Sequence, residues 1–235
     1  MINTKYRTDA IEIMDDFALQ GENLLDALDK IASINRLLGG NKLTIQGLQS
    51  VIKTLPKDKE ITIVDVGCGN GDMLRGIAKY GKENHYQFKL IGIDANRFTI
   101  EYAKKLSKNE PTITYMCNNI FDADFAHLKY DIVLCTLTLH HFKDEEIVKI
   151  LSVFYSNATV GMVINDLQRS TLSYRLFQVV CFVFQLNEMP RKDGLVSILR
   201  GFKKKELIDF SEKLRFKKYS IQWKWAFRYQ WIITK

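Results

Sequence analysis

The segment ITIVDVGCGNGD, residues 61–72, joins a β-branched run directly to a turn with glycines at alternate positions. The run suits a strand that is buried on both faces, as in a parallel sheet covered by helices. Gly67, Gly69 and Gly71 lack the side chains that would keep backbone amides away from a ligand, and they permit backbone angles closed to other residues. The segment therefore predicts a nucleotide-binding turn in an α/β fold.

The spacing of later residues narrows the class of nucleotide. In the dinucleotide-binding fingerprint the third glycine falls one position later, where this chain has Asp72, so hydride chemistry is disfavoured. A carboxylate that binds ribose hydroxyls is expected about 20 residues further on, at the end of the next strand. The run FKLIGID supplies that strand and ends in Asp94. Together, these features predict an adenosine-binding half.

Apolar periodicity along the chain predicts seven strands. Five are separated by helical patterns or short linkers and are expected to run parallel. The last two are joined by too few residues for a helical crossover, so they are expected to pair antiparallel. The fold class is therefore α/β, with a Rossmann-like, doubly wound, seven-stranded sheet of five parallel strands plus a C-terminal antiparallel hairpin. The expected strands are residues 61–66, 88–94, 112–117, 130–136, 158–165, 216–224 and 227–234.

Two segments fall outside this sheet and define the expected domains. Residues 1–54 carry apolar side chains at helical spacing and are expected to form an N-terminal helical cap or lid. The helix ends at Gly39 and Gly40, which indicate either an ordinary C-terminal stop or the hinge of a lid. Residues 55–235 are expected to form the main domain, with a helical insertion at about 167–201.

The insertion contains an apolar stretch, residues 172–186, which is shorter than the roughly 20 residues that a bilayer span needs. It is expected to form a buried helix, an oligomer contact or the roof of a hydrophobic pocket. The buried helix is the preferred interpretation and does not exclude the pocket. As a roof, the stretch would present Tyr174, Phe177 and Phe184 to a flat or greasy substrate.

Composition agrees with one enzyme domain. The 235 residues, 46% of them hydrophobic, are enough to bury a large core. The four cysteines lie far apart and are interpreted as small buried residues in a reducing compartment. The N-terminal stretch lacks the apolar core of a signal peptide, so a cytoplasmic monomer or homodimer with no transmembrane segment is expected.

A net charge of +7 makes nucleic-acid binding a hypothesis to be weighed. Basic residues gather near the C-terminus beside Trp223, Trp225 and Trp231, which could stack bases. The alternation of aromatic and polar residues is instead typical of strands with aromatic side chains on a packed face and charges in solvent. A solvated basic face is favoured over an RNA groove, and nucleic acid is not expected as a partner.

The motifs DVGCGNGD, GIDAN and DIVLCTLTLHHF resemble the successive motifs of class I S-adenosylmethionine-dependent methyltransferases, and the likeness covers about Leu55 to Lys235. The resemblance implies S-adenosylmethionine as cofactor and S-adenosylhomocysteine as product. It places Asn119 where many members have an acidic residue against the adenine amine, and an amide oxygen can accept the same hydrogen bond. The residues implied to bind the cofactor are Asp65, Gly67, Gly69 and Gly71 around its amino acid part, Asp94 at the ribose, Ala95 and Asn96 beside the adenosine, and Asn119, Ile120 and Leu137 after the third and fourth strands.

The catalytic residues are expected at the carboxyl edge of the sheet, where ligands bind in open α/β folds. His140 and His141 follow the fourth strand, and histidine is well matched to removing a hydroxyl proton near neutral pH. Either would act as the base or as a hydrogen-bonded pocket wall, with a slight preference for His141 as the base. Asp166 would orient a histidine, bind substrate or cap the next helix. Arg169 would hold an anionic group.

No metal site is expected from the sequence. His140 and His141 are interpreted as a continuation of the fourth strand, and adjacent strand residues point to opposite faces. No other pair of histidines or carboxylates has convincing metal-ligand spacing.

A narrower resemblance rests on MDD near the start, NRLLGG, LHHF and NDLQRS. These motifs look like bacterial methyltransferases associated with type III polyketide synthases, which implies O-methylation of a phenolic or enolic oxygen on a small hydrophobic acceptor. Carbon methylation in quinone-type biosynthesis, an RNA methyltransferase and a noncatalytic cofactor-binding subunit remain as alternatives. The RNA alternative is weakened because NDLQR lacks the Asn or Asp, Pro, Pro, aromatic motif that base-nitrogen methylation often uses.

Overall fold

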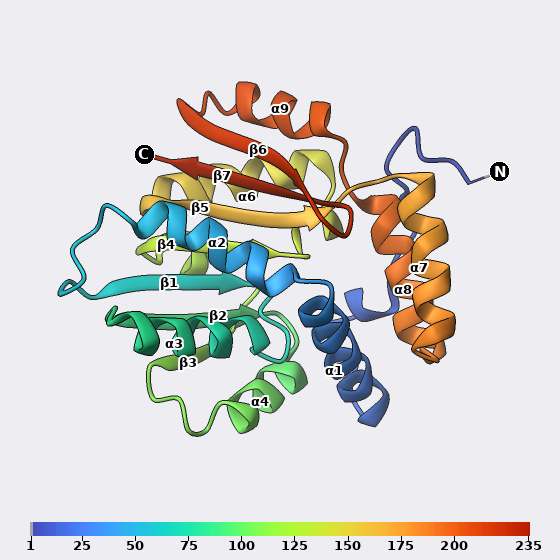
Figure 1. The fold of residues 1–235 in the computed structure, drawn as a ribbon, viewed down its shortest axis with the longest axis horizontal. Coiled ribbons are helices and arrows are strands. Elements are labelled where there is room, and N and C mark those ends of the chain that lie inside the picture. Colours follow the sequence, from blue (N-terminus) through green and yellow to red (C-terminus); the bar gives the residue numbers. More distant parts are fainter. Residues whose placement is uncertain (1) are drawn as a thin grey trace.

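The computed structural model describes residues 2–235 and is built on one seven-stranded sheet with the strand order β3-β2-β1-β4-β5-β7-β6 (Figure 1). Strand β7 runs antiparallel to both of its neighbours, and the other strands are parallel. The predicted fold class, with its C-terminal hairpin, is therefore confirmed. The strands are β1 (Ile61–Val66), β2 (Phe88–Asp94), β3 (Ile113–Cys117), β4 (Tyr130–Thr136), β5 (Ala158–Leu167), β6 (Lys218–Lys224) and β7 (Arg228–Thr234).

Strand β1 lies at the point where the chain changes direction across the sheet. After β1 the chain adds β2 and β3 on one side and then returns to place β4 on the other. Asp65 therefore pairs with Gly92 of β2 and with Leu134 of β4. A crevice opens at the carboxyl ends of the strands at such a switch point, and this is where ligands bind in open α/β sheets.

Helices cover both faces of the sheet, which explains the unbroken apolar run of β1. Ile63 packs in a core cluster with residues of α2, α3 and α4, whereas Val64 packs in a second cluster with residues of α5, α6 and α9. Neighbouring strand residues point to opposite faces, so both must be apolar. These helices are α2 (Gly40–Ile52), α3 (Asp72–Asn84), α4 (Arg97–Leu106), α5 (Ala123–His127), α6 (Asp144–Asn157) and α9 (Lys204–Lys213).

The remaining elements gather beyond the carboxyl ends of the parallel strands (Figure 1). Helix α1 ends at Leu37, Gly39 adopts a left-handed conformation with φ of 77°, and α2 begins at Gly40. Of the two helices within residues 1–54, α1 lies off the sheet, whereas α2 packs on β5 and β7. The division of the chain at residue 54 stays a prediction. The elements in this region are η1 (Ile13–Asp15), α1 (Glu22–Leu37), η2 (Leu139–His141), α7 (Thr171–Val183) and α8 (Glu188–Arg200).

Helix α7 corrects the preferred interpretation of residues 172–186 as a buried helix. Its Phe177, Val180 and Cys181 pack towards α1 and the α7–α8 loop, but no element within residues 2–235 covers the opposite face. Leu176, Val179 and Phe182 on that face are exposed. Periodicity could not reveal this, because a helix that is apolar all round gives no sign of which face is covered. Within residues 2–235 no helix has both the length and the apolar character needed to cross a bilayer.

The C-terminal hairpin also differs in part from the expectation. Trp231 of β7 is fully buried, as the alternation predicts. Trp223 and Trp225 are exposed, because β6 is the edge strand and the hairpin turn extends beyond the core. The prediction of aromatic side chains on a packed face is therefore right for Trp231 of β7 and wrong for Trp223 and Trp225.

We predict that Trp231→Ala lowers the free energy of unfolding by about 3–5 kcal/mol, because it leaves a large cavity in the core. Urea denaturation at constant pH measures this change. Trp225→Ala is the matched control, since this side chain is 70% exposed, and it should shift stability by less than about 0.5 kcal/mol. Equal losses in both variants would contradict the packing described for β7.

Candidate functional site

The glycine turn after β1 has the backbone geometry that its sequence predicts. Gly67, Gly69 and Gly71 all have positive φ, at 68°, 52° and 77°. A Cβ at Gly67 would lie 2.3 Å from Thr138 Oγ1, and one at Gly71 would lie 2.0 Å from Tyr115 Oη. Both positions therefore require glycine for conformation and for space.

Asp94 joins this turn to the start of α4. Its carboxylate accepts hydrogen bonds from the backbone amides of Gly69, at 3.1 Å, and Asn96, at 3.0 Å. Burial raises the pKa of Asp94, and these backbone bonds oppose the rise. The Asn96 side chain caps α4 by accepting from Thr99 N at 2.9 Å and donates to Leu19 O at 2.8 Å.

Asp65, at the end of β1, is a second carboxyl group in this half of the site. Burial, together with the nearby charge of Asp94, raises the pKa of Asp65 to about 8. At neutral pH the carboxyl is therefore mainly protonated. A cationic ligand group placed beside it would favour the carboxylate, so this pair of acids is suited to binding positive charge.

A single cavity of about 690 Å³ runs from the glycine turn to a cluster of polar side chains beyond β4 and β5. This volume is within the range of pockets for small ligands and cofactors. Gly71 does not line it and is instead the N-cap residue of α3. The other residues expected to bind a cofactor all line it: Asp65, Gly67, Gly69, Asp94, Ala95, Asn96, Asn119, Ile120 and Leu137.

Two of these lining residues have local roles as well. The Asn119 side-chain oxygen accepts a hydrogen bond from Phe121 N at 3.0 Å. One of its lone pairs is therefore used to stabilise the local turn of residues 119–121. Leu137 has a φ of 54° and its amide donates to Asn165 O at 2.9 Å. This left-handed residue ends β4 and turns the chain into the helical turn η2.

The helical turn η2 places His140 and His141 differently from the expectation that they point to opposite faces of a strand. Strand β4 ends at Thr136, and the two histidines lie on the 3-10 turn η2. Their ring centroids are 4.3 Å apart, and both side chains line the cavity. The strand-based argument against a paired histidine site is therefore wrong.

Asp166 holds His140 in place. Its carboxylate lies 2.7 Å from His140 Nδ1 and accepts from the His140 amide at 3.2 Å. Burial opposes ionisation of Asp166, but His140 beside it keeps the pKa of the carboxyl below its ordinary value. Asp166 does not cap α7, since the Ser170 side chain does so by accepting from Ser173 N at 3.1 Å. Of the three roles expected for Asp166, the geometry favours orientation of a histidine.

The N-terminal segment supplies acidic residues that sequence reasoning missed. His141 Nδ1 lies 2.6 Å from Asp15, which also pairs with Arg200 at 2.6 Å. Burial would raise the pKa of Asp15, but His141 and Arg200 lower it well below its ordinary value. Glu12 accepts from Ser197 Oγ at 2.8 Å, and burial raises its pKa to about 7.

Further contacts hold this segment against η2 and α8. Arg7 donates to the carbonyl oxygens of His140 and Phe142, both at 2.7 Å. Asp193 of α8 accepts from the amides of Ile13 and Met14, at 2.8 and 3.0 Å. The acidic cluster EIMDD in the sequence was the only signal of this role, and it carries no periodicity that places it near the histidines.

The walls between the two ends are apolar. Phe177 lines the cavity as expected, but Tyr174 and Arg169 do not. The guanidinium of Arg169 is buried and donates to Gly201 O, Glu206 and backbone oxygens of the N-terminal segment. The expectation that Arg169 binds an anionic substrate group is corrected, because these contacts occupy its donors. The apolar walls are Leu24, Leu28, Ile31, Leu167, Phe177, Leu186, Pro190 and Ile198.

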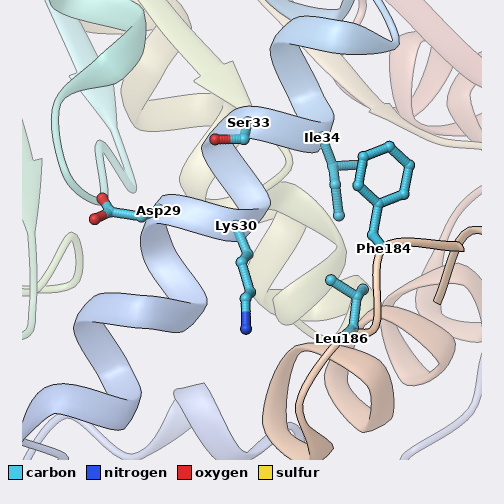
Figure 2. Close-up of a pocket in the computed structure, with 6 residues that line it drawn as sticks. All are labelled: Asp29, Lys30, Ser33, Ile34, Phe184 and Leu186. Carbon is cyan, nitrogen blue, oxygen red and sulfur yellow. The ribbon is translucent and has the colours of Figure 1, made fainter. Parts of the chain in front are cut away.

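A smaller hollow of about 170 Å³ adjoins the cavity between α1 and the α7–α8 loop. Figure 2 shows Ile34 of α1 facing Phe184 and Leu186, with Lys30 at the side. Ile34 and Leu186 line both the hollow and the main cavity. The hollow and the main cavity therefore have these two apolar side chains in common.

Comparisons with known proteins agree with this arrangement. Residues 63–161 match the family model described as a methyltransferase domain. Over 97 residues the chain is 31% identical to the mitochondrial ubiquinone biosynthesis O-methyltransferase of Saccharomyces cerevisiae. That alignment covers 40% of this chain and spans only 29% of the yeast protein.

Solved structures extend the likeness to nearly the whole chain. The plantazolicin methyltransferase BpumL in complex with SAH has a TM-score of 0.66 at 18% identity, covering 88% of this chain and 89% of that chain. The magnesium protoporphyrin IX methyltransferase ChlM from Synechocystis PCC 6803 with bound SAM has a TM-score of 0.60 at 14% identity, covering 97% and 98%. The resemblance to class I S-adenosylmethionine-dependent methyltransferases is confirmed for the domain and the fold. The narrower resemblance to polyketide-associated enzymes stays a prediction.

Proposed function

We propose that this protein transfers the methyl group of S-adenosylmethionine to an oxygen atom of a small, largely apolar acceptor. The observation that carries the proposal is the single cavity that joins the glycine turn and Asp94 at one end to His140 and His141 at the other. Its apolar walls suit a phenolic or polyketide-type compound. A cytoplasmic location and a monomeric or homodimeric state stay predictions.

The cofactor would occupy the half of the cavity beside β1 and β2. S-adenosylmethionine supplies an electrophilic methyl group on a sulfonium, so it brings positive charge to the site. Asp65 would balance the charge of its amino acid part, and Asp94, already fixed by two backbone amides, would accept from the ribose hydroxyls. Asn96, which caps α4, and Ala95 would lie beside the adenosine, with Ile120 against the base.

The acceptor would lie between the apolar walls, with its hydroxyl at the histidine pair. Methyl transfer requires the oxygen to be held in line with the methyl group and to lose its proton. His140, His141 and Asp166 are the proposed catalytic group: the two rings line the cavity, and Asp166 fixes the ring of His140. Phe177 would contact the apolar part of the acceptor.

We expect the affinity for S-adenosylmethionine to rise between about pH 5.5 and 7.5, by up to tenfold per pH unit. The pKa of Asp65 is raised to about 8, so the free protein holds a proton there that a cationic ligand displaces. Calorimetry in buffers of different ionisation enthalpy measures both the affinity and the released proton. In the control Asp65→Asn, the number of protons released on binding, and with it the slope of log affinity against pH, should fall by up to one. An unchanged slope would contradict the assignment of Asp65 as the group that loses the proton.

We expect Asp94→Ala to weaken S-adenosylmethionine binding by about 1.5–3 kcal/mol, the value of a charge-assisted hydrogen-bond pair. The exposed carboxylate Asp124 provides the control Asp124→Ala, which should bind as the wild type does. Circular dichroism verifies that both variants fold. Unchanged affinity in Asp94→Ala would show that the ribose site has been placed wrongly.

Incubation with labelled S-adenosylmethionine and a panel of phenols, polyketides and tRNA tests the reaction itself. We expect methyl ethers of small phenols or enols. His140→Ala and His141→Ala should lower turnover by about 10²-fold or more with cofactor affinity retained. The exposed His127 supplies the control His127→Ala. Carbon-methylated products, methylated tRNA or no transfer to any acceptor would each favour one of the three alternatives instead.

A further inference from the structure

Three side chains converge at the polar end of the cavity: Glu12 from the N-terminal segment, and His140 and His141 from η2. Each offers one nitrogen or oxygen ligand atom, and these atoms all lie within 4.8 Å of one another. Glu12 Oε1 is 3.7 Å from His140 Nε2, too far for a hydrogen bond between them. Atoms bound to one ion at about 2.0–2.2 Å can be separated by this distance.

Two of these atoms are buried without a hydrogen-bond partner in the described part of the chain. Glu12 Oε1 and His140 Nε2 both have this property, and their residues are 4% and 2% exposed. Buried polar atoms are almost always satisfied, so a buried, unpartnered pair calls for a bound group.

The surroundings of the three residues are those of metal ligands. The ring of His140 bonds through Nδ1 to Asp166 at 2.7 Å, while its Nε2 faces Glu12. His141 Nδ1 lies 2.6 Å from Asp15 and 3.9 Å from Glu12 Oε1. Histidines that bind metal commonly donate their other ring N–H to a carboxylate, which fixes the ring and its tautomer. Ser197 Oγ likewise fixes Glu12 by donating to Oε2 at 2.8 Å.

We propose that Glu12, His140 and His141 bind one divalent transition metal ion of the zinc type, with a coordination position open to the acceptor end of the cavity. Two imidazoles and one carboxylate are a ligand set of catalytic zinc sites, which keep one position open. All three residues line the cavity, so the open position faces it. The inference rests on the proposed function and specifies how that site handles an acceptor hydroxyl: the ion binds the oxygen and favours loss of its proton to solvent.

Titration of chelator-treated, full-length protein with Co²⁺ tests the proposal, because Co²⁺ replaces zinc and its visible absorption reports low coordination number. We expect saturation at one equivalent. Glu12→Gln and His141→Ala should each weaken binding by about 10²-fold or more, since removing a ligand exceeds the effect of removing its supporting partner. His127→Ala and Glu145→Gln, at exposed positions, are the matched controls and should bind as the wild type does.

Calorimetry with S-adenosylmethionine on the same variants verifies that the cofactor half has folded. Binding of Co²⁺ that is not saturable at one equivalent, or that is unchanged in Glu12→Gln, would overturn the proposal. If a variant does not fold, anomalous diffraction from crystals of the wild type soaked in Zn²⁺ tests the site instead. An anomalous peak among the three side chains supports the site, and peaks only elsewhere overturn it.

The proposed function and the metal site fail in different ways. Full methyl transfer by protein that has been stripped of metal and assayed with chelator would overturn the metal site alone. Saturable Co²⁺ binding with no transfer to any acceptor would support the metal site and overturn the proposed reaction.

Discussion

The bonds from the Asp94 carboxylate to two backbone amides are the contact on which the rest of the cavity depends. They join the glycine turn after β1 to the start of α4, so the two loops that line the first half of the site cannot move apart independently. The Gly69 amide that donates to this carboxylate belongs to a turn in which Gly67, Gly69 and Gly71 all have positive φ. Burial raises the pKa of Asp94, and the two backbone bonds oppose the rise by stabilising the carboxylate.

The second half of the site is built differently. Its polar groups come from η2, β5, α8 and the N-terminal segment, and long-range hydrogen bonds place them. Arg7 reaches the carbonyl oxygens of η2, while Asp193 holds the backbone of η1. Local backbone geometry therefore defines the nucleotide end, and contacts between distant parts of the chain define the acceptor end.

This contrast explains how much could be predicted from the sequence. The strands and the glycine turn follow from signals a few residues long, and their predicted bounds agree with the structure to within about two residues, within the accuracy of boundary assignment. The histidine pair was located but given the wrong geometry, because one left-handed residue, Leu137, ends β4 early. Glu12 and Asp15 were missed as site residues, since His141 and Asp15 are 126 positions apart and no local pattern links them. Arg169 was misassigned because its partner Glu206 lies 37 positions further along the chain, in α9.

The docking of the N-terminal segment on α8 has a consequence for the order of events during synthesis. Residues 7–15 leave the ribosome well before their partners Asp193, Ser197 and Arg200, which emerge only after all five strands from β1 to β5. The nucleotide half can condense while translation continues. The acceptor half can fold only after α8 has left the ribosome. A nascent chain would therefore form its cofactor-binding half before its acceptor-binding half.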